Sequence, residues 1–133
     1  GLGDVYKRQY NDFENYINHR NNTSTTRKED LTHRFYTLMM DNYREHKEVI
    51  FYADKLHVSS KYLSEVVKET SGKSPKDWII DYSLLEIKEL LKNSSLNIQE
   101  ITIRTKFLNQ SALGRFFKRH TNMSPSEYRE STY

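Results

Sequence analysis

The chain has 133 residues, 35% of them hydrophobic, and a formal net charge of +3. It contains no cysteine, which excludes a disulfide framework and cysteine-based metal or thiol chemistry and fits a cytoplasmic location. No apolar run approaches the roughly 18 residues that a membrane-spanning helix needs, so no membrane partner is expected. The length predicts one domain, or one domain with a tail.

The N-terminal residues are predicted to stand apart from the main fold. Residues 1–9 look unlike the rest, and we interpret them as a cloning or sequence-assembly scar. Apolar side chains at 10, 13, 16 and 17 have helical spacing and predict a short helix. The polar stretch 21–30 then breaks this pattern and predicts a linker.

A first long helix is predicted to open at Asp30 or Thr32. Its apolar residues have the spacing i, i+4, i+7, i+8 and i+12, and they are Leu31, Phe35, Leu38, Met39 and Tyr43. This stripe is expected to pack on the rest of the domain. Residues 49–56 then predict a helix of about two turns.

The next helix is predicted to follow a cap at Ser59 or Ser60 and to end at Gly72. Its inward residues are expected to be Tyr62, Leu63, Val66 and Val67. Ser74-Pro75 opens a long helix to about Lys92, because proline fits the first turn of a helix. Its apolar residues are Ile80, Leu84, Ile87 and Leu91 in one stripe, widened by Trp78, Ile79, Leu85 and Leu90.

The C-terminal third is predicted to alternate short helices and turns in the same way. Residues 98–107 predict a short helix, Leu108-Asn109 a turn, and residues 110–121 a helix with inward side chains Leu113, Phe116 and Phe117. A last short helix is expected from Pro125. No stretch alternates with period two for long enough to predict a strand. The expected fold class is therefore all-α.

The last two thirds of the chain contain an internal repeat. "KETSGKSPKDW" (68–78) and "KRHTNMSPSEY" (118–128) share a helix end and a Ser-Pro helix start. Upstream the offset is 49 rather than 50, which indicates one residue added at the head of the second copy's helix. Each copy has the helix-turn-helix outline. The joining helix of roughly 18 residues is roughly 27 Å long. Two recognition helices held by it are predicted to enter adjacent major-groove segments, which repeat every roughly 34 Å.

Basic residues gather around the second copy. Residues 101–126 carry no acidic side chain and five basic ones, namely Arg104, Lys106, Arg115, Lys118 and Arg119. This favours double-stranded DNA as the partner, although such a run is also typical of a solvated helix face. A helical protein–protein interaction module without DNA binding stays open as the alternative.

An enzyme is the less favoured class. The five histidines are scattered, none has HExxH spacing, and no glycine-rich phosphate loop occurs among only four glycines. We therefore expect no catalytic residue, no metal site and no cofactor.

Two segments, "YADKLHVSSKYLSEVVKETSGKSPKDWI" and "ITIRTKFLNQSALGRFFKRHTNMSPSEYRE", resemble the tandem helix-turn-helix domain of AraC/XylS-type bacterial transcription regulators. The resemblance covers residues 49–130 and implies a seven-helix domain, here residues 29–133, that binds DNA. It also implies an absent N-terminal sensing and dimerisation domain, which would bind an effector, and RNA polymerase as a protein partner. Residues 1–28 would then be the scar, the trailing helix of that domain and the linker. Activator and repressor roles both stay open.

The chain departs from the family pattern at several positions. The family usually has alanine at Thr102, glycine at Lys106 and Asn122, phenylalanine at Val67, and aromatic residues at Ala112-Leu113. Lys106 is the sharpest change, because it puts a long side chain at the junction between helix and turn.

In the first copy, the resemblance implies that Lys61, Ser64 and Glu65 point into the groove. A carboxylate there can accept a hydrogen bond from the cytosine amino group. The alternative is that Glu65 pairs with Lys61 or Lys68 on its own helix. Ser60 and Lys68 are the expected phosphate contacts.

In the second copy, the candidate base contacts are Gln110, Ser111, Ala112 and Arg115. Gln110 suits adenine, Arg115 suits guanine, and Ala112 suits a thymine methyl group. As alternatives, Gln110 would cap its helix and Arg115 would be a plain surface residue. The expected phosphate contacts are Asn109, Lys118 and Arg119.

Overall fold

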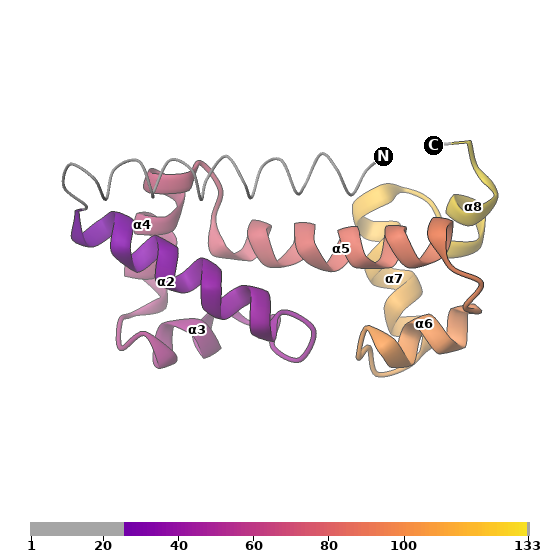
Figure 1. The fold of residues 1–133 in the computed structure, drawn as a ribbon, viewed down its shortest axis with the longest axis horizontal. Helices are drawn as coiled ribbons and strands as arrows, with labels where there is room; N and C mark the ends of the chain where they lie inside the picture. The colour runs from indigo at the N-terminus through magenta and orange to yellow at the C-terminus, as the bar shows by residue number, and fades with distance from the viewer. Residues whose placement is uncertain (1–25, 133) are drawn as a thin grey trace. The chain divides into compact units, whose positions relative to one another are not determined.

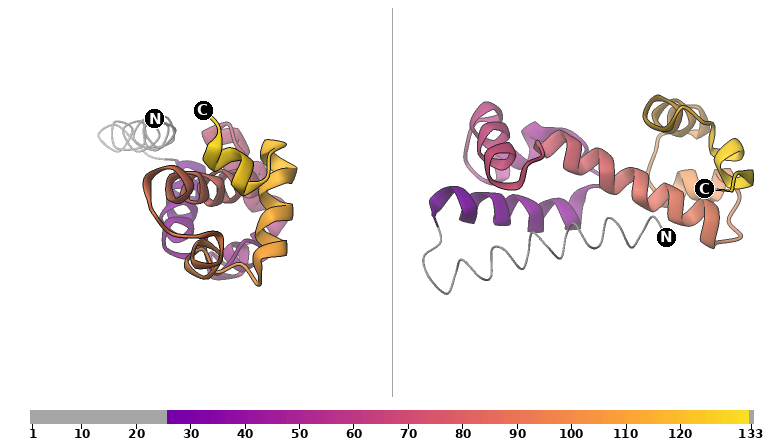
Figure 2. Two further views of the ribbon diagram at one scale, coloured as in Figure 1. Left: turned by 90° about the vertical axis from the view of Figure 1, so that its right-hand side faces the viewer. Right: turned by 90° about the horizontal axis from the view of Figure 1, so that it is seen from above.

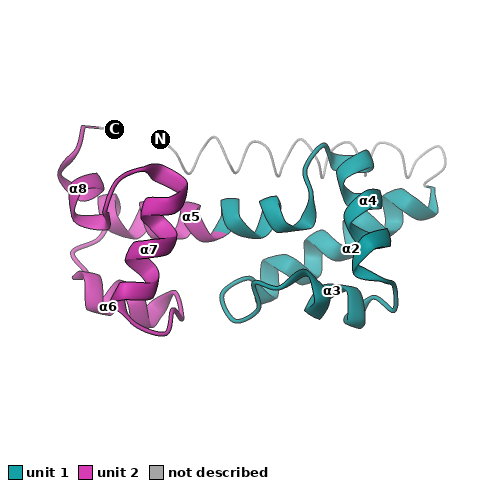
Figure 3. Cartoon of the chain, turned by 180° about the vertical axis from the view of Figure 1, so that it is seen from behind, with its two compact units in different colours: residues 1, 3–82 teal, residues 2, 83–133 magenta. Residues whose placement is uncertain are grey.

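The computed structural model describes residues 26–132, which form seven α-helices and no strand (Figure 1). The all-α prediction is confirmed. The chain divides into two compact units, whose described parts are residues 26–82 and 83–132 (Figure 3). The division falls within α5 (Pro75–Asn93). The scar and the short helix predicted within residues 1–25 lie outside the described residues.

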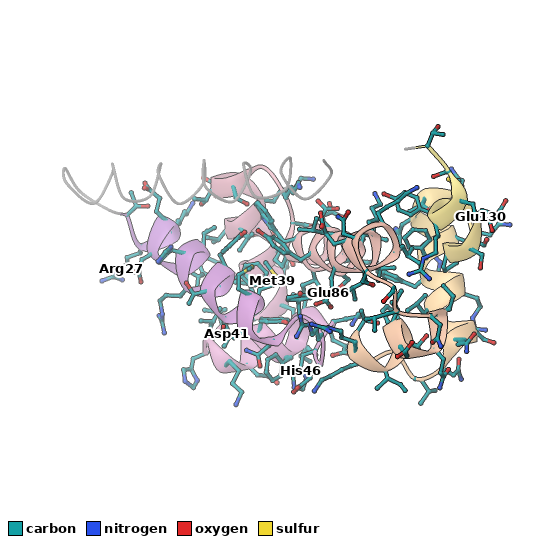
Figure 4. All side chains as sticks on the ribbon, turned by 45° about the vertical axis from the view of Figure 1, so that its right-hand side comes forward. Arg27, Met39, Asp41, His46, Glu86 and Glu130 are labelled. Carbon is teal, nitrogen blue, oxygen red and sulfur yellow. The ribbon has the colours of Figure 1, made fainter. Side chains whose placement is uncertain are left out.

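The first unit contains α2 (Arg27–Asn42), α3 (Val49–Lys55), α4 (Ser60–Ser71) and the start of α5. Its core is aromatic and aliphatic, and its most deeply buried side chains are Phe35, Tyr36, Met39, Tyr52, Leu63 and Val67. Figure 4 shows Met39 among the helices of this unit, with Asp41 on the outer side of α2. The rings of Phe35 and Tyr52 meet edge to face at 5.4 Å, which joins α2 to α3.

Helix α2 begins earlier than the sequence reading predicts. Thr26, not Asp30 or Thr32, is its cap, and the Thr26 hydroxyl accepts a hydrogen bond from the backbone N–H of Glu29 at 3.1 Å. The Thr26-x-x-Glu29 spacing is that of a capping box, so the signal lay within the stretch interpreted as a linker. Of the predicted stripe, Leu38 and Tyr43 are only half-buried.

The second unit contains the rest of α5, α6 (Ile98–Arg104), α7 (Gln110–Thr121) and α8 (Pro125–Glu130). Its buried side chains include Ile87, Leu91, Ile101, Leu113, Phe117 and Tyr128. The Leu84, Ile87 and Leu91 stripe of α5 is confirmed, whereas Ile80 and Leu90 are only half-buried.

Polar contacts attach α8 to the C-terminal end of α5, beside which it lies in Figures 1 and 2. Arg129 donates from Nε to the carbonyl of Leu91 at 2.8 Å and from its terminal nitrogen to that of Leu90 at 3.2 Å. Lys92 Nζ in turn donates to the carbonyl of Ser131 at 2.5 Å. The last carbonyls of a helix have no backbone partner within it, so Arg129 supplies a donor to the Leu91 carbonyl and joins the Ser94 hydroxyl at the Leu90 carbonyl.

The two helix-turn-helix turns share one backbone conformation. His57 and Lys106 each follow the C-cap residue of the preceding helix and have positive φ angles of 59° and 62°. The second turn makes α6 end at Arg104, so the helix predicted to reach Phe107 is too long. A left-handed residue interrupts the helical hydrogen-bond pattern, and this explains why the family's usual residue at Lys106 is glycine.

Replacing either residue by glycine is expected to stabilise the domain. The left-handed conformation costs a non-glycine residue roughly 1–2 kcal/mol, and the greater freedom of glycine in the unfolded chain offsets about 0.4–1 kcal/mol of the gain. We therefore expect Lys106→Gly and His57→Gly each to raise the free energy of unfolding by about 0.5–1 kcal/mol, measured by urea titration.

The matched control is Gly72→Ala. Gly72 has φ 84°, and an added Cβ would meet nothing within 4 Å, so its effect reports the backbone alone. It should lower the free energy of unfolding by about 1 kcal/mol. A loss of stability in both glycine variants would show that their side chains contribute more than the strain costs.

Candidate nucleic-acid interface

Helix α4 presents the predicted DNA-contacting residues of the first unit on its outer face. Ser59 caps the helix, since its hydroxyl accepts from the N–H of Tyr62 at 3.0 Å, and Ser60 is therefore the first helical residue. Leu63, Val66 and Val67 are buried. The helical period then turns Lys61, Glu65 and Lys68 outward, where all are exposed, and leaves Ser64 half-exposed.

The side chain of Glu65 has no partner on this face. It makes no hydrogen bond or ion pair within the described residues, so the alternative pairing with Lys61 or Lys68 is not formed. The neighbouring acid, Glu69, is different, because Lys28 of α2 lies 3.2 Å from its carboxylate. Glu65 is therefore left to solvent or to a partner molecule.

The inward position predicted for Tyr62 is wrong. Its side chain is 44% exposed, because it lies about one helical residue step, 100°, away from the buried side of α4. It joins the outer face in the first turn of the helix, beside Lys61. The sequence pattern missed it because a tyrosine has an apolar body and a polar tip and fits either environment.

Helix α7 carries the corresponding residues of the second unit. The Asn109 side-chain oxygen accepts from the N–H of Ala112 at 2.8 Å, so Asn109 is the N-cap, and Leu113 and Phe117 are buried. Phe116, predicted inward, is half-buried and packs on Phe107 at 5.1 Å between ring centres. The predicted contacts Gln110, Ser111, Arg115, Lys118 and Arg119 are exposed, and Ala112 is half-exposed.

Two of these residues already have partners in the free protein. The oxygen of Asn109 is used as the cap, and Gln110 Nε2 donates to Gln99 Oε1 of α6 at 2.8 Å, at an exposed site. The side chains of Arg115 and Arg119 make no hydrogen bond or ion pair within the described part of the chain. Their guanidinium groups are therefore available to an anionic or hydrogen-bonding partner.

Leu108 lies exposed beside the start of α7, where the sequence pattern predicts only a turn. Its side chain is 91% exposed, directly before the Asn109 cap. Phe107 N donates to the Thr102 carbonyl at 3.1 Å, as Val58 N does to Ala53 at 3.0 Å, so both turns agree up to that point. The added residue of the second copy is thus Leu108 in the turn, not a residue at the head of the helix.

The comparison with known families follows this architecture. The model described as "Helix-turn-helix domain" matches residues 52–131, which cover both copies of the repeat. The chain belongs to the AraC/XylS-type helix-turn-helix family. The departure from the family pattern at Lys106 leaves the turn geometry unchanged. Lys106 adopts the left-handed conformation that glycine usually has there, as His57 does in the first unit.

Relatives and solved structures agree with this membership. The chain is similar to the Msm operon regulatory protein of Streptococcus mutans, with 31% identity over 78 residues, 59% of this chain and 28% of that protein. It is also similar in structure to the C-terminal domain of AraT, a response regulator from Geobacillus stearothermophilus. There the TM-score is 0.69 and the identity 25%, over 81% of this chain and 93% of that one.

A third likeness concerns the fold alone. The DNA-binding domain of AdpA, solved in complex with a target DNA, has a TM-score of 0.63 at 23% identity, over 74% of this chain and 88% of that one. The chain spans about a third of the length of the curated relatives that it matches. Membership of the family therefore does not assign to this chain the ligands or target genes of those longer proteins.

The described residues form neither a metal site nor a membrane span. Among residues 26–132, no three histidine, aspartate or glutamate side chains are grouped so that they could hold a metal ion. None of the helices described is both long and apolar enough to cross a membrane.

Proposed function

We propose that this chain is the DNA-binding part of a sequence-specific transcription regulator, with α4 and α7 as its two recognition helices. The observation that carries the proposal is the exposed face of α7, which bears three basic side chains and no acidic one on a family-defining helix-turn-helix frame. The phosphates of DNA of any sequence attract this basic face, and the same helix offers side chains that can distinguish bases.

The base contacts are assigned by chemistry and position. Arg115 lies one turn after the first residue of α7 and suits guanine O6 and N7, while Ala112 suits a thymine methyl group. Gln110 and Ser111 lie in the first turn, where Gln110 would exchange its exposed bond to Gln99 for an adenine edge. In α4 the corresponding contacts are Lys61, Ser64 and Glu65.

The phosphate contacts lie at the edges of these helices. Lys118 and Arg119 follow Arg115 by about a turn and hold the backbone without reading sequence. Lys68 does the same for α4. Ser60 and Asn109 lie at the helix starts, and the amide nitrogen of Asn109 is left to donate because its oxygen caps the helix.

The engagement of adjacent major-groove segments is part of the proposal. Its support is the length of α5, whose 19 residues correspond to about 28 Å of helix, against about 34 Å between successive grooves. In the full-length protein, RNA polymerase would be the protein partner, and an effector would bind a domain outside this chain. The cytoplasm is the expected location.

The test is salt-dependent binding to duplex DNA. Each phosphate contact releases counterions, so log K should fall linearly with log salt, with a slope of about −0.9 per contact. Fluorescence anisotropy with a labelled random duplex measures this between low and moderate salt. A flat response, or no binding at low salt, would favour the protein–protein interaction module instead.

A further inference from the structure

The two helix-turn-helix units repeat the same local frame to the level of single hydrogen bonds. Their N-caps are fifty residues apart, and both helices end in a left-handed residue, Gly72 or Asn122. The Ser71 hydroxyl has the carbonyl oxygens of residues 67 and 73 as acceptors at 2.7 and 3.1 Å, which share its one hydrogen, and the Thr121 hydroxyl has those of 117 and 123 at the same distances. Positions of α4 and α7 can therefore be compared one to one.

On this shared frame the exposed charges are inverted. Glu65 of α4 corresponds to Arg115 of α7, and Glu69 corresponds to Arg119. Helix α4 thus carries two basic and two acidic residues, whereas α7 carries three basic residues and no acidic one. Only the lysine position is kept, as Lys68 and Lys118.

The two acids of α4 are not equivalent. Lys28 neutralises Glu69 at 3.2 Å, while Glu65 has neither an ion pair nor a hydrogen bond within residues 26–132. An uncompensated carboxylate on a groove-facing helix is repelled by the phosphates of every DNA sequence. It is compensated only where the groove offers it a hydrogen-bond donor, and the cytosine amino group is the donor that suits a carboxylate.

We propose that the two units have different roles in DNA binding. Helix α7 supplies most of the sequence-independent affinity, and Glu65 of α4 weakens binding to every site that lacks a cytosine opposite Glu65 in the groove. This inference rests on the proposed function. It assigns the specificity of the first unit to a penalty on wrong sequences as well as to contacts with the right one.

The experiment compares three glutamine variants on two duplexes, one of random sequence and one selected from a random pool by the unsubstituted chain. Glu65→Gln removes the charge and keeps the shape, and it should tighten binding to random duplex by about fivefold, as for two unit charges roughly 4 Å apart in a water-like medium. The ratio of selected to random affinity should fall by at least as much. Because Glu65 has no partner, thermal melting should not change.

The control variants use the same frame. Glu69→Gln, which also releases Lys28, should tighten binding to both duplexes about equally and leave the ratio of selected to random affinity unchanged. Arg119→Gln, at the equivalent position in α7, should weaken both duplexes alike and lower the salt slope by about one. A Glu65→Gln chain that binds random duplex no tighter than the unsubstituted chain overturns the inference. If the unsubstituted chain binds no duplex even at low salt, the proposed DNA-binding function is wrong as well as the inference.

Discussion

Leu91→Asp is expected to unfold the second unit at room temperature. The Leu91 side chain is 2% exposed on α5, in a unit whose buried side chains also include Ile101, Leu113 and Phe117. A carboxylate buried without a partner costs several kcal/mol, either as the charge itself or as the shift in pKa needed to neutralise it. That is a large part of the roughly 5–15 kcal/mol that stabilises a typical domain.

Circular dichroism at 222 nm with thermal melting measures the loss of helix. Leu85→Asp should unfold the unit in the same way, because the Leu85 side chain is only 9% exposed. Lys76→Asp is the matched control, because Lys76 is exposed in the first turn of α5, where an acidic residue suits the helix dipole. That variant should stay folded. A Leu91→Asp chain with native melting would show that this face of α5 is not buried in solution.

Arg115→Ala and Lys118→Ala are expected to weaken DNA binding in different ways. If Arg115 bonds a guanine edge, its loss should cost about 1–3 kcal/mol of binding free energy and relax the preference at one base position. If Lys118 holds a phosphate, its loss should weaken all sequences about equally and lower the salt slope by about one. The difference follows from position, since Arg115 is nearer the start of α7.

Binding to the selected site and to its single-base variants, at two salt concentrations, separates these outcomes. Arg115 has no partner within the described residues, so its removal leaves no unpaired group in the protein and the effect reports the DNA contact. If Arg115→Ala lowers affinity uniformly and keeps the base preference, Arg115 is a second phosphate contact and the assigned base role is wrong.

Much of the fold follows from local rules that a sequence displays. The cap at Ser59 needs only a side-chain oxygen close to the first free N–H groups of a helix. The Ser-Pro start at residues 124–125 needs only the fixed φ of proline, and it carries a complete capping box with Glu127. For this reason the all-α class and the order of the helices follow from residues that lie near one another in the chain, and the repeat follows from finding the same local signals fifty residues apart.

The errors share a different origin. The spacing of Tyr62 fits the apolar stripe and predicts an inward side chain, but only the neighbouring helices decide which edge of the stripe is covered. The sequence alignment predicts the extra residue at the head of the helix, and only the matching hydrogen bonds of the two turns show that the added residue is Leu108. The cap at Thr26 is not predicted because the polar residues around it are typical of a linker.

The sequence by itself determined the order of the helices, their Ser-Pro starts and the candidate DNA-contacting residues, since helix periodicity and capping depend on side chains within one or two turns. Only the tertiary structure decided which of those residues are free to act. Arg129 is held by the end of α5, and Glu69 is neutralised by a lysine 41 residues away. Glu65 and Arg115 are left without a partner in the described residues. The physical reason is that a hydrogen bond or ion pair depends on distance in space, which the spacing along a chain does not fix.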